Sequence, residues 1–127
     1  MEKAVSILFE NSEGKILLFL RDNNPTIPYP NQWDILGGKI EEGETPEKAI
    51  IREMREELEL NLKDFDIFKI FQWRDITEIV FYKKINIDID QTNLHEGQKI
   101  KYFSEEELNL MNLAFHGNQI IKNFFNK

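Results

Sequence analysis

The segment GGKIEEGETPEKAIIREMREELEL, residues 37–60, contains the strongest structural signal in this chain. A double glycine comes first, and a pattern that predicts a helix follows from Thr45-Pro46. Threonine is a favourable N-cap, and proline at the first helical position gives up an N–H that would have no helical partner. The apolar positions of this helix recur at helical spacing and share one face, which must be buried: Ile50, Ile51, Met54 and Leu58.

A second face of the same predicted helix is acidic. Glu53, Glu56 and Glu57 lie on an arc beside the apolar face, with Arg52 at its edge. Like charges at this spacing repel by about 0.2–0.5 kcal/mol per pair, and a bound cation would reverse that sign. Taken alone, the three acids favour a solvated helix face, because runs of glutamate on helices usually have that role.

The full pattern resembles the Nudix box. Its double glycine, isolated acid, capped helix and paired acids match the box at these positions: Gly37, Gly38, Glu44, Arg52, Glu53, Glu56 and Glu57. The resemblance implies an α/β fold, an α/β/α sandwich around a mixed β-sheet, in a single domain over residues 1–127. It also implies an enzyme that uses a divalent metal to hydrolyse a nucleoside diphosphate linked to another group.

The resemblance further implies a set of site residues. Oxygen ligands suit Mg²⁺, the expected cofactor, with Mn²⁺ as a substitute. The expected metal ligands are the Gly37 carbonyl and the carboxylates of Glu53, Glu56, Glu57 and Glu96. Glu53 is the expected general base, Arg52 and Glu44 are expected to orient the acids, and Gly38 and Lys39 are expected to face the substrate.

Three residues outside the box are further candidates. Glu96, in the segment His95-Glu96-Gly97-Gln98, matches the position of a metal-binding glutamate in MutT-like relatives; the alternative is an ordinary loop acid. Arg21 ends a predicted strand and is either a phosphate-facing residue or a surface charge. Asn118 lies near the position of a base-binding asparagine in those relatives, although a helix N-cap is the more common role.

Composition narrows the class of partner. The chain has 127 residues, a net charge of −7 and no cysteine. The negative charge argues against binding to a nucleic-acid polymer, and the lack of cysteine excludes disulfides, thiol catalysis and cysteine-ligated zinc. No apolar run is long enough to span a membrane and no signal-peptide pattern is present, so a cytoplasmic protein is expected. The sequence leaves monomer and homodimer open.

The rest of the chain predicts a β-β-(β)-α-β-β-β-α-α order without repeats. Strands are expected at 4–9, 15–21, 33–35, 65–73, 77–87 and 99–103, and short helices at 104–110 and 118–125. Residues 11–14 predict a hairpin turn, and 22–30, with three of the four prolines, a loop. Four aromatic residues either stack on a base or, more often for such positions, belong to the core: Trp33, Phe71, Trp73 and Phe81.

Two positions depart from the usual box. Leu36 stands where proline is usual, and Glu59 stands where glycine usually ends the helix in the left-handed (αL) conformation. The helix is therefore expected to run to Leu60, with Asn61 as the αL residue. The metal ligands precede this site, so activity is expected to survive.

Three functions remain for the chain. The first is hydrolysis of a nucleoside triphosphate, such as an oxidised purine nucleotide, to a monophosphate and pyrophosphate. The second keeps the chemistry but changes the substrate to ADP-ribose, a sugar nucleotide or a dinucleoside polyphosphate. The third is a non-catalytic nucleotide-binding module, which the intact set of acids disfavours.

Overall fold

The predicted succession of strands and helices is present in the structure. A computed structural model describes residues 2–126. Six strands form a single sheet: β1 (Glu2–Glu10), β2 (Ile16–Leu20), β3 (Trp33–Lys39), β4 (Asp66–Gln72), β5 (Ile76–Lys84) and β6 (Lys99–Phe103). Three α-helices accompany them: α1 (Pro46–Leu58), α2 (Glu105–Asn109) and α3 (Gly117–Phe125). A 3₁₀ turn, η1 (Ile89–Gln91), precedes β6.

The sheet is mixed, and β1 lies near its centre. Its strand order is β4-β5-β1-β3-β2-β6. β1 runs parallel to β5 and antiparallel to β3, and the remaining neighbours pair antiparallel. This arrangement places β3, which ends in the double glycine, directly beside the central strand.

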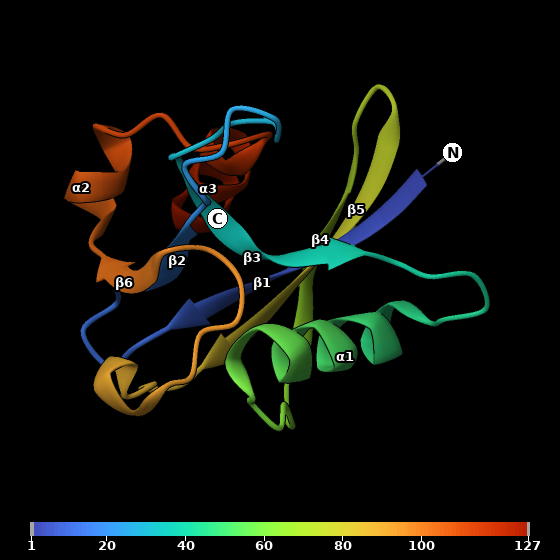
Figure 1. The fold of residues 1–127 in the computed structure, drawn as a ribbon, viewed down its shortest axis with the longest axis horizontal. Coiled ribbons are helices and arrows are strands. Elements are labelled where there is room, and N and C mark those ends of the chain that lie inside the picture. The colour runs from blue at the N-terminus through green and yellow to red at the C-terminus, as the bar shows by residue number, and fades with distance from the viewer. Residues whose placement is uncertain (1, 127) are drawn as a thin grey trace.

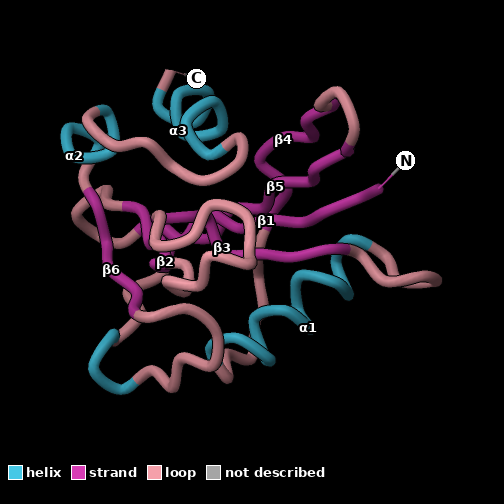
Figure 2. The backbone as a smooth tube through the Cα atoms, turned by 45° about the horizontal axis from the view of Figure 1, so that its top comes forward, coloured by secondary structure: helices cyan, strands magenta, loops and turns pink. Residues whose placement is uncertain are grey.

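Helices cover both faces of the sheet. Figure 2 shows α1 on one side of the sheet and α2 and α3 on the other. Alternate residues of β1 point to the two sides, so Val5, Ile7 and Phe9 pack with α1 while Leu8 packs with α3. The predicted α/β/α sandwich around a mixed sheet is therefore confirmed (Figure 1).

The box helix α1 begins as predicted. Thr45 is its N-cap, and the Thr45 side chain accepts a 3.1 Å hydrogen bond from the Lys48 N–H. Its apolar face is seated on the sheet, where Ile50 and Met54 are fully buried. Burial of each such side chain contributes about 1.5–3 kcal/mol to stability, so packing rather than helix propensity holds α1 in place.

The predicted end of α1 is wrong. The helix ends at Leu58, and Glu59 itself takes the left-handed conformation with φ 54° and ψ 31°. The backbone N–H of Glu59 donates to the Arg55 carbonyl at 3.0 Å, and that of Leu60 donates to Met54 at 3.1 Å. These two bonds satisfy carbonyls at the helix end, and they hold a non-glycine residue in a conformation that glycine usually takes.

Smaller differences lie at element ends. β2 ends before Arg21, and β5 ends at Lys84 rather than at residue 87. α3 begins at Gly117, with His116 as its N-cap, so Asn118 is not the N-cap that the sequence favoured. The Asn118 side chain instead forms hydrogen bonds with the backbone of the preceding loop. The predicted turn at residues 11–14 is present, with Gly14 at φ 77°.

Candidate metal centre

Three carboxylates from two separate parts of the chain meet beside the sheet. Glu53 and Glu57 lie one turn apart on α1, and Glu96 lies in the loop that leads into β6. One oxygen from each of these three side chains lies within 4.8 Å of the other two. A divalent cation with oxygen ligands matches this donor set in chemistry and in reach.

Glu57 makes this group unusual for an acidic helix. The residue is only 3% exposed, and among residues 2–126 its Oε2 has no hydrogen-bond partner. Burial, followed by the hydrogen bond and charge of Glu53, raises the pKa of Glu57 well above its ordinary value. A buried carboxylate oxygen without a hydrogen-bond partner costs free energy, and a cation would offset that cost. A solvated acidic face does not explain this side chain.

Burial and the charge of Glu53 act on Glu96 in the same direction as on Glu57. Burial and the negative charge of Glu53 raise its pKa, while the positive charge of Arg21 lowers it. The predicted fourth carboxylate is thus brought to the two helix acids by the tertiary fold. Its role as a ligand stays a prediction.

Both glycines that open the segment are needed for close approach. A Cβ on Gly38 would lie 2.4 Å from Cδ of Glu53, and a Cβ on Gly37 would lie 2.1 Å from the Val5 carbonyl oxygen. Real Cβ contacts are never that short, so any side chain here would push β3 away from α1 or from β1. The double glycine therefore sets the distance between the sheet and the acids.

Arg52 ties the box loop to the helix. Its Nε and Nη2 donate to the two oxygens of Glu44 at 2.6 and 3.0 Å, and its Nη1 donates to Glu53 at 2.8 Å. A further bond from Nη2 reaches the Lys39 carbonyl at 3.1 Å. The Arg52 hydrogen bond holds the pKa of Glu44 below its usual range. Such two-pronged charge-assisted bonds fix geometry, which fits the expected orienting role of both residues.

Glu56 lies outside the group of three. Its side chain is 58% exposed, and its Oε2 lies 3.3 Å from Nη1 of Arg52. Its charge still raises the pKa of Glu96, so Glu56 stands at the rim of the centre. Helix spacing alone does not explain the difference, because residues three and four positions after Glu53 are both its neighbours. The packing of α1 on the sheet buries Glu57 and leaves Glu56 exposed.

Arg21 is paired rather than free. Its Nη1 lies 3.4 Å from Oδ2 of Asp34, its Nε donates to the Pro28 carbonyl at 3.0 Å, and its guanidinium lies 5.0 Å from the Phe115 ring centroid. The other predicted cation, Lys39, is 73% exposed and its Nζ lies 3.2 Å from Glu2. The structure thus puts Arg21 in electrostatic range of Glu96, while the Lys39 ammonium is paired with Glu2 at the surface.

Asp34 is a residue that the sequence interpretation missed. Burial raises its pKa to about 7 despite the opposing charge of Arg21, and its own charge raises the pKa of Glu57. The sequence did contain a signal for Asp34. An aspartate between Trp33 and Ile35 in a strand points to the opposite face of the sheet from these two apolar neighbours. That face is the one covered by α1.

With the fold and this geometry established, comparison with known proteins identifies the family. A family profile described as the NUDIX domain matches residues 1–124. This chain belongs to the Nudix family. An ADP-ribose pyrophosphatase of Methanocaldococcus jannaschii is 33% identical over 119 residues, 88% of this chain and 66% of that protein. An 8-oxo-dGTP diphosphatase of Haemophilus influenzae is 35% identical over 98 residues, 72% of this chain and 68% of that protein.

Solved structures show the same Nudix fold. A MutT protein from Methanosarcina mazei Go1 has a TM-score of 0.77 at 22% identity, covering 98% of this chain and 93% of that one. The NUDIX domain of Shewanella oneidensis NrtR, solved with ADP ribose, has a TM-score of 0.78 at 18% identity, covering 98% and 86%. At these identities the similarity supports the fold alone. The first curated relative is matched over just under two thirds of its length.

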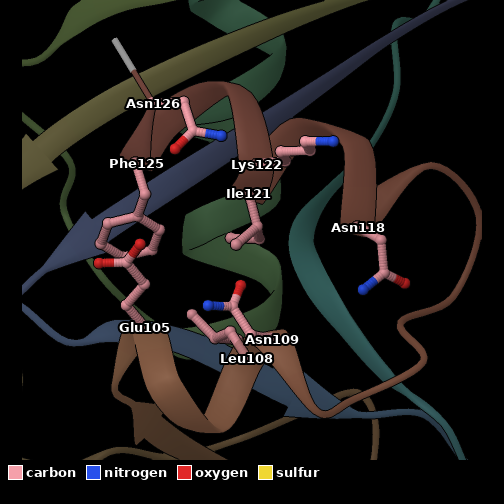
Figure 3. A pocket seen from close by; sticks show the side chains of 8 residues that line it. All are labelled: Glu105, Leu108, Asn109, Asn118, Ile121, Lys122, Phe125 and Asn126. Carbon is pink, nitrogen blue, oxygen red and sulfur yellow. The ribbon is translucent and has the colours of Figure 1, made fainter.

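Asn118 of this Nudix domain supports its own loop. Its Oδ1 accepts a 2.8 Å hydrogen bond from the Leu113 N–H, and its Nδ2 donates to the Met111 carbonyl at 2.9 Å. The residue lies at the rim of a groove between α2 and α3 (Figure 3). Contact with a base stays a prediction, and it would compete with these two bonds.

The aromatic candidates divide into two groups. Phe71 and Phe81 are buried in the core, as their strand positions favoured. Trp33 packs edge-on against Phe103, and Trp73 stacks on both Phe71 and His116, with centroid distances of 5.0 and 4.2 Å. Both tryptophans are only partly buried, and both pack against the part of the core that α2 and α3 cover.

Among residues 2–126, no helix has the length and apolar character needed to cross a membrane.

Proposed function

We propose that this Nudix domain hydrolyses a nucleoside diphosphate linked to another group, with a divalent cation held by Glu53, Glu57 and Glu96. The buried, partnerless Oε2 of Glu57 is the observation that carries the proposal. A purely structural acid in that position would leave an uncompensated cost, whereas a cation-binding acid would not. Mg²⁺ is the proposed cation and Mn²⁺ the proposed substitute. The Gly37 carbonyl is the proposed main-chain ligand, and Glu56 is assigned to the rim.

The residues present suit the attack of water on a phosphoanhydride. A divalent cation, when bound, neutralises phosphate charge and favours ionisation of the attacking water. A new P–O bond forms to the water oxygen, the anhydride P–O bond breaks, and Glu53 accepts the proton from the water. Arg52 keeps one Glu53 oxygen in place through a 2.8 Å hydrogen bond, which orients the other toward the centre.

Within this class we propose a nucleoside triphosphate as the substrate and a monophosphate and pyrophosphate as the products. Similarity to the 8-oxo-dGTP diphosphatase of Haemophilus influenzae supports this choice, and an oxidised purine nucleotide is the first compound to test. The second candidate is ADP-ribose, which the longer match to the pyrophosphatase of Methanocaldococcus jannaschii favours. The proposed substrate contacts in either case are Arg21, Gly38, Lys39 and Asn118.

The deciding experiment is product analysis over a nucleotide panel with Mg²⁺, Mn²⁺ or EDTA. The panel contains common and oxidised dNTPs, ADP-ribose, sugar nucleotides and dinucleoside polyphosphates. Metal-dependent release of pyrophosphate from one triphosphate would support the first candidate, and turnover of ADP-ribose to AMP would support the second. Binding of nucleotides without any turnover would contradict catalysis and indicate a binding module.

A further inference from the structure

The loop that carries Glu96 is attached at two places. On its C-terminal side, the Gln98 N–H donates to the Leu20 carbonyl at 2.8 Å, and the Gln98 side chain donates to the Arg21 carbonyl at 2.7 Å. These bonds tie the loop to the end of β2. They hold one side of Glu96 but leave its distance from α1 undetermined.

The attachment to the end of α1 goes through two bonds of His95, and the Asn93 side chain adds a hydrogen bond to Glu59. The His95 N–H donates to the Glu57 carbonyl at 2.8 Å. That carbonyl lies in the last turn of α1, where helix carbonyls lack a partner within the helix. Nε2 of His95 also hydrogen-bonds to Oε2 of Glu59. The neighbour of Glu96 is therefore bonded twice to the helix end that supplies Glu57.

Glu59 occupies a conformation that glycine adopts more easily. Its φ of 54° lies in the left-handed region, which carries a steric cost for any residue with a Cβ. Glycine at this position would remove that cost but would also remove the carboxylate.

We propose that Glu59 and His95 form a latch that holds Glu96 against Glu53 and Glu57, which makes both of them positioning residues of the metal centre. Neither residue belongs to the group of three carboxylates. The inference rests on the proposed function, because it assumes that the three carboxylates bind a cation. It goes further in stating that cation affinity depends on an exposed pair outside the centre.

The test is the substitution Glu59→Gly with Mn²⁺ binding as the readout. A hydrogen bond between two exposed side chains accounts for up to about fivefold in an equilibrium constant, so Mn²⁺ affinity should fall by about three- to fivefold. The melting temperature of the metal-free protein should not fall, because glycine relieves the left-handed cost. Amide exchange at residues 94–98 in the metal-free protein should become faster. Lost affinity with retained stability separates positioning from general destabilisation.

Four further variants complete the design: three single substitutions and the double variant Glu59→Gly/His95→Ala. Glu59→Gln keeps a hydrogen-bond acceptor and should keep Mn²⁺ affinity within twofold of the original. Asp64→Gly relieves another left-handed residue, φ 51°, whose carbonyl accepts from Lys83, and it should leave Mn²⁺ affinity unchanged. His95→Ala should weaken Mn²⁺ binding as Glu59→Gly does, and the double variant should be no weaker than either single one.

Two failures can be told apart. If the unaltered protein binds no Mn²⁺ and hydrolyses nothing in the panel, the proposed function fails and the latch has no centre to serve. If the unaltered protein binds Mn²⁺ and Glu59→Gly binds it equally well, the latch is wrong while the proposed function stands. Additive losses in the double variant would also overturn the latch.

Discussion

At the scale of single residues, Glu56 and Glu57 are neighbours with opposite surroundings. The Glu57 side chain is buried with a partnerless oxygen, whereas the Glu56 side chain is 58% exposed beside Arg52. The spacing of acids along the sequence could not separate them, because both fall on the acidic arc of the helix. Their burial depends on how deeply α1 sits on the sheet, which is a property of the fold.

The first prediction uses this contrast. Glu53→Gln and Glu57→Gln should each lower kcat by more than about a hundredfold, because each removes a charged oxygen from the proposed centre. Glu56→Gln should lower kcat by less than about tenfold. Steady-state kinetics with saturating Mg²⁺ provides the measurement, and Glu47→Gln, an exposed acid on the same helix, is the control. Equal losses in all three variants would return Glu56 to the ligand set.

The second prediction concerns Arg52. Arg52→Ala should lower kcat/KM and also destabilise the protein by about 1–3 kcal/mol, because charge-assisted bonds to Glu44 and Glu53 are lost. Arg52→Lys should restore little of the activity, since a lysine ammonium cannot bridge two carboxylates and a carbonyl at once. Urea denaturation and kinetics on the three proteins decide the matter. Normal kinetics in Arg52→Lys would show that charge alone matters.

At the scale of elements, local signals predicted the helix starts that a side chain caps. Thr45 caps α1 as expected and Ser104 caps α2, because a capping side chain bonds to N–H groups only a few residues away. The end of α1 was predicted wrongly. Glutamate has no intrinsic preference for the left-handed conformation, and the contacts that accompany it, those with His95, are distant in sequence.

The third prediction concerns the packing of α1 against the sheet. Met54 is fully buried between this helix and the sheet, so Met54→Ala should lower the free energy of unfolding by about 2–5 kcal/mol. The exposed Lys48→Ala on the opposite side of the helix should change it by less than about 0.5 kcal/mol. Urea unfolding of both variants measures this. A similar small effect for both would mean that α1 is not held by its apolar face.

At the scale of the whole molecule, burial near the centre makes stability depend on pH. The pKa of Asp34 is about 7 in the folded protein against an ordinary value of 3.8. Between these two values the folded state binds more protons than the unfolded state. The Asp34 contribution to stability is therefore fully present below the lower value and is lost as pH rises through the higher one.

The fourth prediction follows from that sign. Asp34→Asn cannot ionise, so its stability relative to the unaltered protein should increase between about pH 4 and pH 8 in EDTA. At about 1.4 kcal/mol per pKa unit, the increase has an upper limit of about 4 kcal/mol. Urea unfolding across this pH range measures the difference. Asp66→Asn, on the exposed edge strand, is the control and should show no such trend; a flat difference for Asp34→Asn would contradict the burial of its charge.

The sequence by itself determined the class of fold and the box. The hydrophobic period, the helix caps and the glycine positions are local signals that act over a few residues. They therefore predicted which segments are strands or helices, and that acids line one face of α1, without knowledge of long-range contacts. Only the tertiary structure decided which acids meet, how Asp34 joins them and what holds Glu96 in place. Glu96 is separated from Glu57 by the whole of β4 and β5, and its approach depends on the order of strands in the sheet. Burial and long-range hydrogen bonds arise only when the chain is packed, and they are what distinguish a metal-binding carboxylate from a solvated one.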